Sequence, residues 1–536
     1  MPQTKIFDMK FQSPYLILAA ILITLASCKK DLLKTNTDPN SVDISQFDAN
    51  NILTATQLYY TGSTNNAIEV EETEIQGAGC FVQHWASTSG YFFGDKYLFS
   101  PGGWGSFFDN TYPSAVKNAV DLYVITANQP QYANLHQIAR IMKALVFERI
   151  TDVYGDVPYF KAGLAYHGSI FFPPYDKQQD IYTDLLKEVS EAVDSLDDNA
   201  DTPGGDLFYK GDDQIGKWRR FGNTLLLRMA MRLTKVDAET AKSYVTKVAG
   251  NTMASNDDNA ILQHGTNDPL TINRIYRGIG EDGSIQLSGQ MSRAFIDTLK
   301  TYNDPRLPVL AYVYPSDFDP SNPDPSGGSS KPEDQLGMPN GYDASNGPHG
   351  LITNDPFFQG DMSIYSRPSP IIFNSTAPTL ILTYAESELL LADAAARWGI
   401  GVAKDHYNNG VLAAITMLSA YGNAGTISGD DAQTYLDGNP YDETNGLDRE
   451  LNQINTQFWI ATFFNEYEAW SNYRRTGFPI LNPVTYPGSQ SPGAVPRRMQ
   501  YSTVDKQVNS TNYNAAVSAL QGGDKITSRM WWDVAQ

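Results

Sequence analysis

The stretch TYAESELLLADAAARW, residues 383–398, decides the fold class of this chain. Its apolar residues recur at helical spacing, and the small side chains of Ala392, Ala395 and Ala396 leave room for a second helix to approach closely. The next helical pattern, Gly410 to Leu418, supplies an apolar partner face. Paired helices of this kind are the units of tetratricopeptide arrays. Because a strict repeat period is not visible, we predict repeat-like helix pairs.

The same helical periodicity dominates the rest of the chain, and strand-like alternation is scarce. We therefore predict an all-α fold with tetratricopeptide-like repeats. Besides Thr379 to Trp398 and Gly410 to Leu418, the predicted helices are Ile52 to Tyr60, Ser114 to Thr126, Tyr132 to Asp152, Gln178 to Leu196, Trp218 to Leu233, Ala238 to Val248, Ser292 to Leu299, Asn455 to Tyr473 and Asn512 to Leu520.

The connections between these helices are long and rich in Gly, Pro, Asn and Asp, above all Tyr312 to Arg367. Loops of such length usually carry function, so we expect this segment to be a functional or ligand-facing loop. No Ser/Gly-rich linker or charge block divides the chain, and residues 42–536 are predicted to form a single domain.

The N-terminus has the layout of an export signal. Lys5 and Lys10 precede an apolar run from Tyr15 to Ala26. As a helix, this run would be about 18 Å long, which is too short to cross a hydrocarbon core of about 30 Å. Residues 1–27 are thus predicted to be a signal peptide. The sequence Leu-Ala-Ser-Cys at 25–28 resembles the lipobox of bacterial lipoproteins, which implies lipidation of Cys28 and a tether over residues 28–41.

The charge and cysteine content narrow the function classes. The formal net charge is -21, and no basic run offsets it, which argues against nucleic acid as a partner. If Cys28 is lipidated, Cys80 is the remaining thiol and no intramolecular disulfide can form. The core must therefore hold the fold.

Several stretches, in this order along the chain, resemble the SusD/RagB family of Bacteroidetes outer-membrane nutrient-binding lipoproteins, and the ending resembles its second SusD-like subgroup. They are YGDVPY at 154–159, PPYD at 173–176, QQDIYTDLLKEVSEAVDSL at 178–196, KWRRFGNTLLLRMAMRL at 217–233, residues 380–396, WIATFFNEYEAWSNYRRTGFP at 459–479 and the tail 497–533. The resemblance implies a non-enzymatic surface lipoprotein that faces the cell exterior. It also implies that the protein delivers a glycan or oligosaccharide to a TonB-dependent transporter of the SusC kind.

Aromatic residues are crowded in HWASTSGYFFGDKYLFSPGGWGSFF, residues 84–108, among Gly, Ser and Asp. Flat rings next to amides and carboxylates can hold sugars, because the rings cover C–H faces and the polar groups bind hydroxyls. Trp104 and Tyr112 are expected to pack in the core. The predicted glycan-binding residues are Trp85, Tyr91, Phe92, Phe93 and Tyr97, completed by Tyr312, Tyr314 or Tyr342 from the long middle segment.

Signatures of enzymes and cofactors are weak. There is no His-Glu-x-x-His, Gly-x-Ser-x-Gly or Walker motif, and the Gly-x-Gly-x-x-Gly at 278–283 lacks a preceding strand, so we interpret it as a turn. We expect no cofactor, although the oxygen-rich segment Asp437 to Asp448 could hold Ca²⁺. Two alternatives stay open: a surface glycoside hydrolase with an unrecognised carboxylate pair, and a peptide-binding receptor of the same family.

The helical segment 459–479 and the chain end are expected to serve the core. Trp470 and Arg474 are four residues apart on one helix, so the indole can lie beneath the arginine. Trp531 and Trp532 would be costly to expose, and we expect them to pack back onto the body.

Overall fold

The computed structural model describes residues 48–64, 67–266, 271–280, 288–319 and 325–535. The signal peptide, Cys28 and the tether lie outside the described residues. Within the chain, Ala49–Gln536 form one compact unit.

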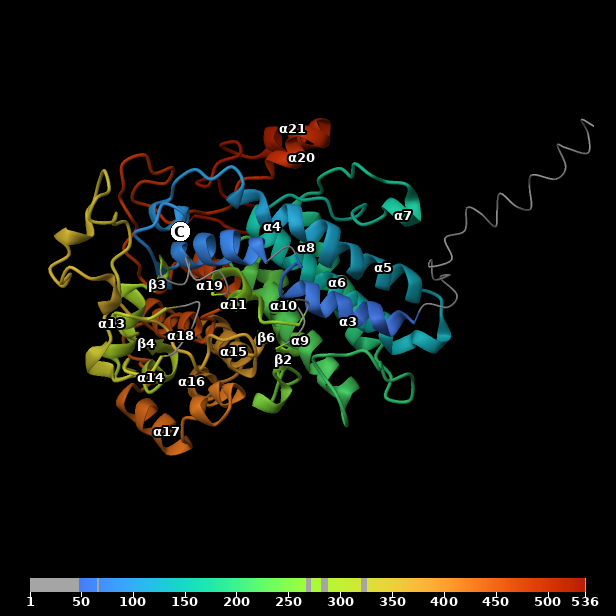
Figure 1. The fold of residues 1–536 in the computed structure, drawn as a ribbon. Helices are drawn as coiled ribbons and strands as arrows, with labels where there is room; N and C mark the ends of the chain where they lie inside the picture. The colour runs from blue at the N-terminus through green and yellow to red at the C-terminus, as the bar shows by residue number, and fades with distance from the viewer. Residues whose placement is uncertain (1–47, 65–66, 267–270, 281–287, 320–324, 536) are drawn as a thin grey trace, which may run out of the picture. The chain divides into compact units, whose positions relative to one another are not determined.

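Helices make up most of this unit (Figure 1). The α-helices are α3 (Ala49–Tyr60), α4 (Gly103–Thr111), α5 (Lys117–Thr126), α6 (Ala133–Tyr154), α7 (Ala165–Gly168), α8 (Gln178–Asp194), α9 (Gln214–Arg232), α10 (Ala238–Val248), α11 (Arg274–Ile279), α13 (Arg293–Thr301), α14 (Leu307–Leu310), α15 (Tyr384–Trp398), α16 (Ala403–Thr416), α17 (Gly429–Gly438), α18 (Leu447–Ala461), α19 (Glu466–Thr476), α20 (Thr503–Val508) and α21 (Ser510–Ala519). A π-helix, η2, spans Val70–Gly79.

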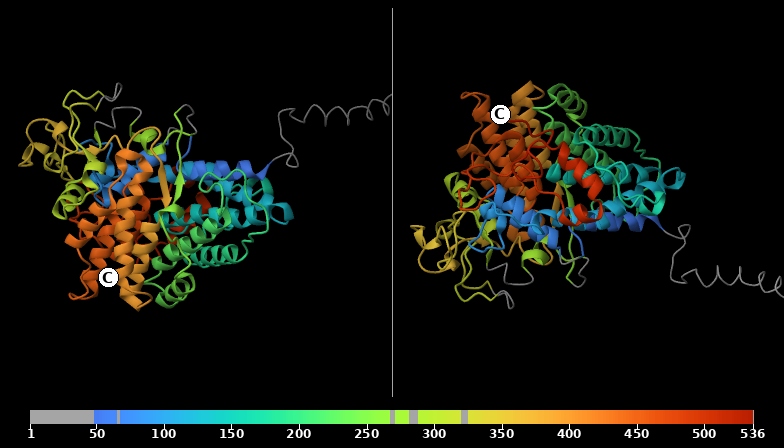
Figure 2. Two further views of the ribbon diagram at one scale, coloured as in Figure 1. Left: turned by 90° about the horizontal axis from the view of Figure 1, so that it is seen from below. Right: turned by 90° about the horizontal axis from the view of Figure 1, so that it is seen from above.

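Successive helices pack side by side, which confirms the repeat-like all-α prediction. Helix α5 contacts α6, α6 contacts α8, α8 contacts α9, and α9 contacts both α10 and α15. Helix α15 then packs against α16 and α18, and these helices run alongside each other in Figure 2. The close approach depends on small residues: a β-carbon at Gly410 would lie 2.7 Å from Cγ of Leu389.

In the part of the chain that the structure describes, three short antiparallel strand pairs connect distant loops. They are β1 (Trp85–Ala86) with β3 (Gln290–Met291), β2 (Ala260–Leu262) with β6 (Thr379–Leu382), and β4 (Ala311–Tyr312) with β5 (Arg367–Pro368). The last pair closes the base of the long middle segment, because Tyr312 is paired with Arg367.

Three predicted helices differ most from the structure. The helix predicted at Gly410 to Leu418 begins earlier, at Ala403, and ends at Thr416 as α16. Residues 379–382 were expected to begin a helix but form β6, and α15 starts only after Thr383, whose side chain accepts a hydrogen bond from the backbone N–H of Glu386. The predicted helix 455–473 is two helices, α18 and α19, separated by Phe464 in the left-handed region at φ 71°. By contrast, α10 has the predicted bounds.

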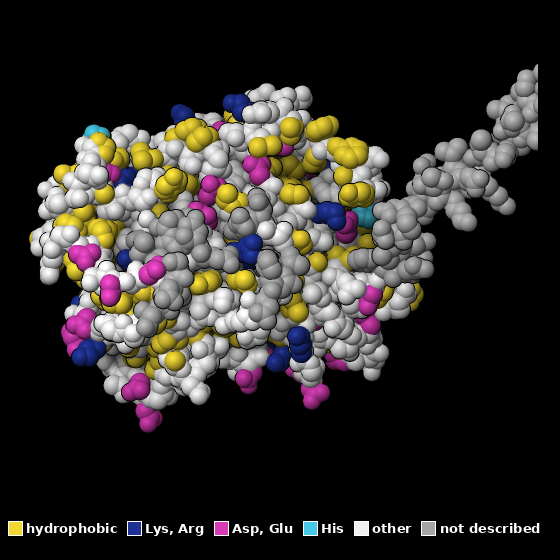
Figure 3. All heavy atoms as spheres, viewed as in Figure 1, with side chains coloured by type: hydrophobic (Ala, Val, Ile, Leu, Met, Phe, Trp, Pro, Cys, Tyr) yellow, Lys and Arg dark blue, Asp and Glu magenta, His cyan; other side chains and the backbone are white. Residues whose placement is uncertain are grey.

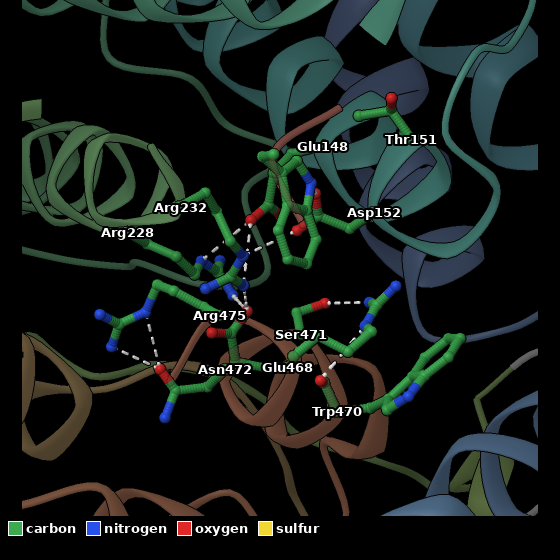
Figure 4. Close-up of polar contacts among 12 residues, drawn as sticks. Glu148, Thr151, Asp152, Arg228, Arg232, Glu468, Trp470, Ser471, Asn472 and Arg475 are labelled. Atoms are coloured by element: carbon green, nitrogen blue, oxygen red, sulfur yellow. Dashed lines mark hydrogen bonds and ion pairs between the residues drawn. The ribbon is translucent and has the colours of Figure 1, made fainter. Parts of the chain in front are cut away.

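A network of buried charged side chains joins α6, α9, α15 and α19 (Figure 4). Arg232 pairs with Asp152 at 2.9 Å and also with Glu468. Arg228 lies 3.3 Å from Glu468, 3.6 Å from Glu148 and 3.5 Å from Glu386 of α15. All these side chains are almost completely shielded from solvent, so the helices are tied together by charges as well as by apolar contacts.

The network contains more carboxyl groups than guanidinium groups. Burial is the largest cause that raises the pKa of Glu148 to about 7 and the pKa of Glu386 to about 8, against the opposing effect of Arg228. Burial therefore favours the protonated form of both groups at pH values where an exposed glutamate is ionised. A proton on either group brings the number of negative charges closer to that of the two arginines, which reduces the cost of burying the cluster.

The chain end packs against this network, as predicted. The indole N–H of Trp532 donates to Asp152 at 2.9 Å, and the ring is buried, whereas Trp531 is partly buried against the core. The guanidinium of Arg474 lies 3.6 Å from the ring centroid of Trp470 and 4.9 Å from that of Trp532. The predicted packing of Trp470 beneath Arg474 is thus confirmed.

Candidate ligand-binding cleft

The aromatic loop at 84–108 does not form the expected exposed platform. Trp85, Phe92, Phe93 and Tyr97 are buried in the main core, together with Trp104. The indole N–H of Trp85 donates to Glu466 at 2.9 Å, and the Phe93 ring lies 4.5 Å from that of Trp104. These four rings cannot form the predicted glycan-binding platform, because their faces are covered by protein. Tyr112 is only partly buried at the edge of the core.

This loop instead supports a neighbouring segment. Asp95 is fully buried and accepts hydrogen bonds from the side-chain amide of Asn340 at 2.7 Å and from the backbone N–H of Gly341 at 2.9 Å. Asn340 also donates to the backbone oxygen of Trp85 at 2.7 Å. The buried loop therefore fixes the position of residues 340–341 from beneath.

The other predicted rings have different positions. Tyr91 is exposed, with 76% of its surface accessible, but does not line the cleft described next. Tyr314 is buried and donates its hydroxyl to Pro368 at 3.0 Å, while Tyr312 donates to Pro325 at 2.7 Å, so both hold the base of the long segment. Tyr342 is half-buried and lines an open cleft.

That cleft has a volume of about 710 Å³, within the range of sites for small ligands. It lies where the start of α13 meets three loops distant in sequence. The lining residues are Gln83, Arg293, Ala294, Asp297, Pro339, Asn340, Gly341, Tyr342, Gly350, Asn354, Asn482, Pro483, Val484 and Thr485. One aromatic ring thus stands among several side-chain amides.

The cleft has firm walls. Tyr342 packs against a small separate core that contains Met338, Ile352 and Tyr365. Arg293 forms a two-pronged pair with Asp355, with distances of 2.8 and 2.7 Å. Burial raises the pKa of Asp355, but the hydrogen bonds and charge of its partners outweigh burial and leave the pKa below its ordinary value. Asp355 therefore stays ionised and keeps Arg293 in place.

The chemistry of the cleft suits a polyhydroxylated neutral ligand. The Tyr342 ring can cover the C–H face of a sugar, and the side-chain amides of Asn354 and Asn482 can bind hydroxyl groups. Asp297 is the single carboxylate among the lining residues. Glycoside hydrolysis ordinarily needs two carboxyl groups on either side of the scissile bond, so this lining favours binding over cleavage.

Glu466 and Glu468, which the sequence places on one helix, do not form a solvent-accessible acid pair. Both are buried: Glu466 lies 2.6 Å from Nδ1 of His84, and Glu468 joins the network around Arg232. Their carboxyl groups hold the core and do not reach the cleft.

No metal centre is evident in the described ranges, where no group of three or more His, Cys, Asp or Glu side chains could hold an ion. In the predicted calcium segment, Asp442 accepts hydrogen bonds from Thr444 and Asn445. Ca²⁺ also binds carbonyl and amide oxygens, so the calcium site stays a prediction. The described helices include none that is both long and apolar enough to span a bilayer.

Comparison with solved structures defines the class of fold. A chitin-binding protein superposes with a TM-score of 0.78 at 34% identity, covering 91% of this chain and all of that one. A Bacteroidetes SusD-like structure gives 0.77 at 24% identity over 91% of this chain and all of its own. A chitin-binding SusD homolog from Flavobacterium johnsoniae gives 0.73 at 23% identity, covering 91% of this chain and 99% of that chain.

The sequence family with the description "Starch-binding associating with outer membrane" matches residues 41–502. The chain therefore belongs to the SusD-like family, as its motifs indicated. No curated protein matches it.

Of the residues that line the cleft, the sequence analysis named Tyr342 as a glycan ligand, which stays a prediction, and it named none of the others. The lining comes from segments between Gln83 and Thr485. No local sequence pattern indicates that residues so far apart lie together. An aromatic residue in a long loop, by contrast, can be recognised from the sequence alone.

Proposed function

We propose that this protein binds a glycan or oligosaccharide in the cleft at Tyr342 and passes it to a SusC-type TonB-dependent transporter, without cleaving it. The observation that carries the proposal is an open cleft of about 710 Å³ that combines a braced aromatic ring with amides on a SusD-like fold. Chitin oligosaccharides are the first ligands to test, because the structural relative at 34% identity is a chitin-binding protein. Starch oligosaccharides come next, given the family description.

Replacing Tyr342 with alanine is expected to weaken glycan binding about 10- to 100-fold. Covering one face of a tyrosine buries roughly half of its ~150 to 250 Å², worth about 2 to 3 kcal/mol gross. Parent affinity should be modest, on the order of micromolar to millimolar, because association itself is costly. Calorimetric titration with chitohexaose and maltoheptaose measures the change.

Tyr91→Ala is the matched control, since this exposed ring lies outside the cleft lining. It should leave binding unchanged. If Tyr91→Ala abolished binding while Tyr342→Ala did not, the site would lie on the loop at 84–108. Release of shorter sugars by the parent protein would favour the hydrolase alternative, and displacement by peptides would favour the peptide receptor.

We further propose that the body is anchored in the outer membrane by lipid on Cys28 and faces the exterior. The support is the lipobox at residues 25–28 and the family's association with the outer membrane. In cells given radioactive fatty acid, the parent should be labelled and Cys28→Ala should not. Equal labelling of both would contradict an anchor at this residue.

An exposed aromatic surface offers a contact site for the transporter. Four rings between α6 and α8 are strongly exposed: Phe160, Tyr166, Phe171 and Phe172. Figure 3 shows hydrophobic side chains gathered over α7 and the α20–α21 pair. Exposed apolar patches of this kind commonly mark protein interfaces.

This surface is held in place from both sides. Asn512 of α21 donates to the backbone oxygen of Phe172 at 3.1 Å, and Asn509 donates to that of Pro173 at 3.1 Å. On the other side, His167 pairs with Asp121 of α5 at 2.8 Å. A pre-organised loop loses little conformational entropy on docking, which favours a stable complex.

The double variant Phe171→Ser with Phe172→Ser is expected to reduce recovery of the transporter about tenfold or more when the protein is captured from mild-detergent extracts. Two exposed rings at an interface can contribute several kcal/mol to binding. Phe357→Ser with Val402→Ser is the control, because these exposed residues lie outside residues 160–172 and outside α20 and α21. If both double variants captured equal amounts of the transporter, the aromatic surface would not be part of the interface.

A further inference from the structure

Arg367, the first residue of β5, is a buried arginine without an ion pair. It is 6% exposed, its Nε atom is completely shielded, and no described residue accepts a hydrogen bond from its guanidinium. The charge of Asp361 acts on it, but in the described part of the chain no carboxylate lies within 4.0 Å of its nitrogens. By contrast, the buried side chains of Arg306 and Arg475 each pair with an aspartate, at 2.6 and 3.0 Å.

An uncompensated charge at this position is costly. Arginine keeps its proton in proteins, so the guanidinium of Arg367 is charged although burial lowers its pKa. Burying a charge without a counter-charge costs more than burying it within an ion pair. The ring centroid of Tyr314 lies 5.8 Å from the guanidinium carbon, at the outer limit of cation–π attraction. The described side chains therefore give this cation little compensation.

A small cavity adjoins Arg367. Its volume is about 10 Å³, which is the space that one water-sized particle needs. The lining residues are Trp85, Ile279, Gly289, Tyr314, Arg367, Pro368 and Phe373. Space for a single small ligand thus lies beside the unpaired cation.

The lining of this cavity favours an anion over a water molecule. The indole N–H of Trp85 donates to Glu466 at 2.9 Å, and the Tyr314 hydroxyl donates to the backbone oxygen of Pro368 at 3.0 Å. Among the lining side chains, Arg367 is thus the one with unused donors. A chloride ion accepts hydrogen bonds and balances the charge, whereas a water molecule also has to find acceptors for its two hydrogens.

We propose that the cavity beside Arg367 binds one chloride ion, which serves as the counter-ion of this arginine. The charge, the size of the cavity and the donor-only guanidinium identify the ligand as a monatomic anion. Arg367 pairs with Tyr312 at the base of the long middle segment. Chloride therefore stabilises the base of the segment that carries Tyr342, whether or not the cleft at Tyr342 binds glycans.

Thermal unfolding at constant ionic strength tests the site. Sodium chloride replaces sodium gluconate stepwise, because gluconate has the same charge but is too large for the cavity. The unfolding midpoint of the parent is expected to rise by about 2 °C or more, since a ligand that binds the folded state stabilises it by mass action. Arg219→Met, which changes a surface ion pair of α9, is the control and should keep this response.

Arg367→Met removes the buried charge together with the reason for the ion. In gluconate the variant should unfold at the same temperature as the parent or at a higher one, because its side chain is of similar size and carries no uncompensated charge. In chloride the parent should gain about 2 °C or more relative to the variant. General effects of the salt act on both proteins and cancel in this difference.

Crystals of the parent grown in sodium bromide locate the ion directly, because bromide scatters anomalously. We expect an anomalous peak in contact with the guanidinium of Arg367. A crystal without this peak would overturn the chloride site and leave water as the occupant. The site would also be overturned if the parent and Arg367→Met responded equally to chloride, or if the variant were much less stable than the parent in gluconate, since the charge would then be compensated within the protein.

Discussion

Replacing Arg232 with methionine is expected to lower the free energy of unfolding by about 3 to 5 kcal/mol, the largest loss that we predict for a single substitution. Arg232 is fully buried and pairs with Asp152 and Glu468. Methionine fills similar space but leaves Asp152 buried without its arginine partner, and Glu468 keeps only Arg228. The cost is the desolvation of these groups, which water cannot reach.

The effect should extend beyond one helix. Asp152 also accepts hydrogen bonds from the Trp532 indole at 2.9 Å and from the Tyr182 hydroxyl at 2.5 Å. Loss of Arg232 would therefore loosen the chain end and α8 together with α6. The midpoint of guanidinium-induced unfolding, followed by tryptophan fluorescence, reports both changes.

Arg219→Met is the matched control, because Arg219 lies on the same helix, α9, and pairs with Asp198 at the surface at 3.1 Å. Exposed pairs of this kind are worth about 1 kcal/mol or less. Adding Asp152→Asn to Arg232→Met should restore part of the lost stability, since it removes the carboxylate that has lost its arginine. If Arg232→Met and Arg219→Met unfolded at the same midpoint, the buried network would not stabilise the fold.

The fold class could be predicted because it is encoded locally. An amphipathic pattern such as that of Ala238 to Val248 specifies both the helix and the face it buries, and the structure reproduces these bounds. The small side chains near 392–396 likewise indicate a close contact with another helix. The break between α18 and α19 could not be predicted, because Phe464 adopts a left-handed backbone with no glycine to signal it.

The candidate site depended on contacts that sequence does not display. The rings at 84–97 have a composition suited to an exposed loop, but Trp85 is drawn into the core by Glu466, 381 residues further along the chain. Residues 379–382 have a helical pattern, yet they pair with β2 far away in sequence. In both cases a long-range partner outweighed the local preference.

The fully buried cluster around Arg228 predicts a second large effect, a dependence of the stability of the fold on pH. For Glu386, with a pKa of about 8 in the folded protein and an ordinary value of 4.5, the folded state binds more protons than the unfolded state between these pH values. Stability therefore falls as pH rises through this window. Glu148, with a pKa of about 7, adds a slope of the same sign.

Glu386→Gln replaces the protonated carboxyl with an uncharged group of similar shape, so its benefit should appear at high pH. Relative to the parent, we expect the free energy of unfolding of the variant to rise by about 1 to 3 kcal/mol between pH 5.5 and pH 8.5. The expected slope is roughly 1.4 kcal/mol per pH unit, reduced by coupling to Glu148. Other groups, such as Glu74 with a pKa of about 7, titrate in both proteins and cancel in the difference.

Denaturation midpoints at several pH values between 5.5 and 8.5 measure this difference. Glu239→Gln, at an exposed position of α10, is the control and should follow the parent throughout. Parallel pH profiles for the parent and Glu386→Gln would mean that Glu386 carries the same charge in the folded and unfolded states. The excess of carboxyl groups in the core would then have to be neutralised by another member of the network, and Glu148→Gln would be the variant that changes the slope.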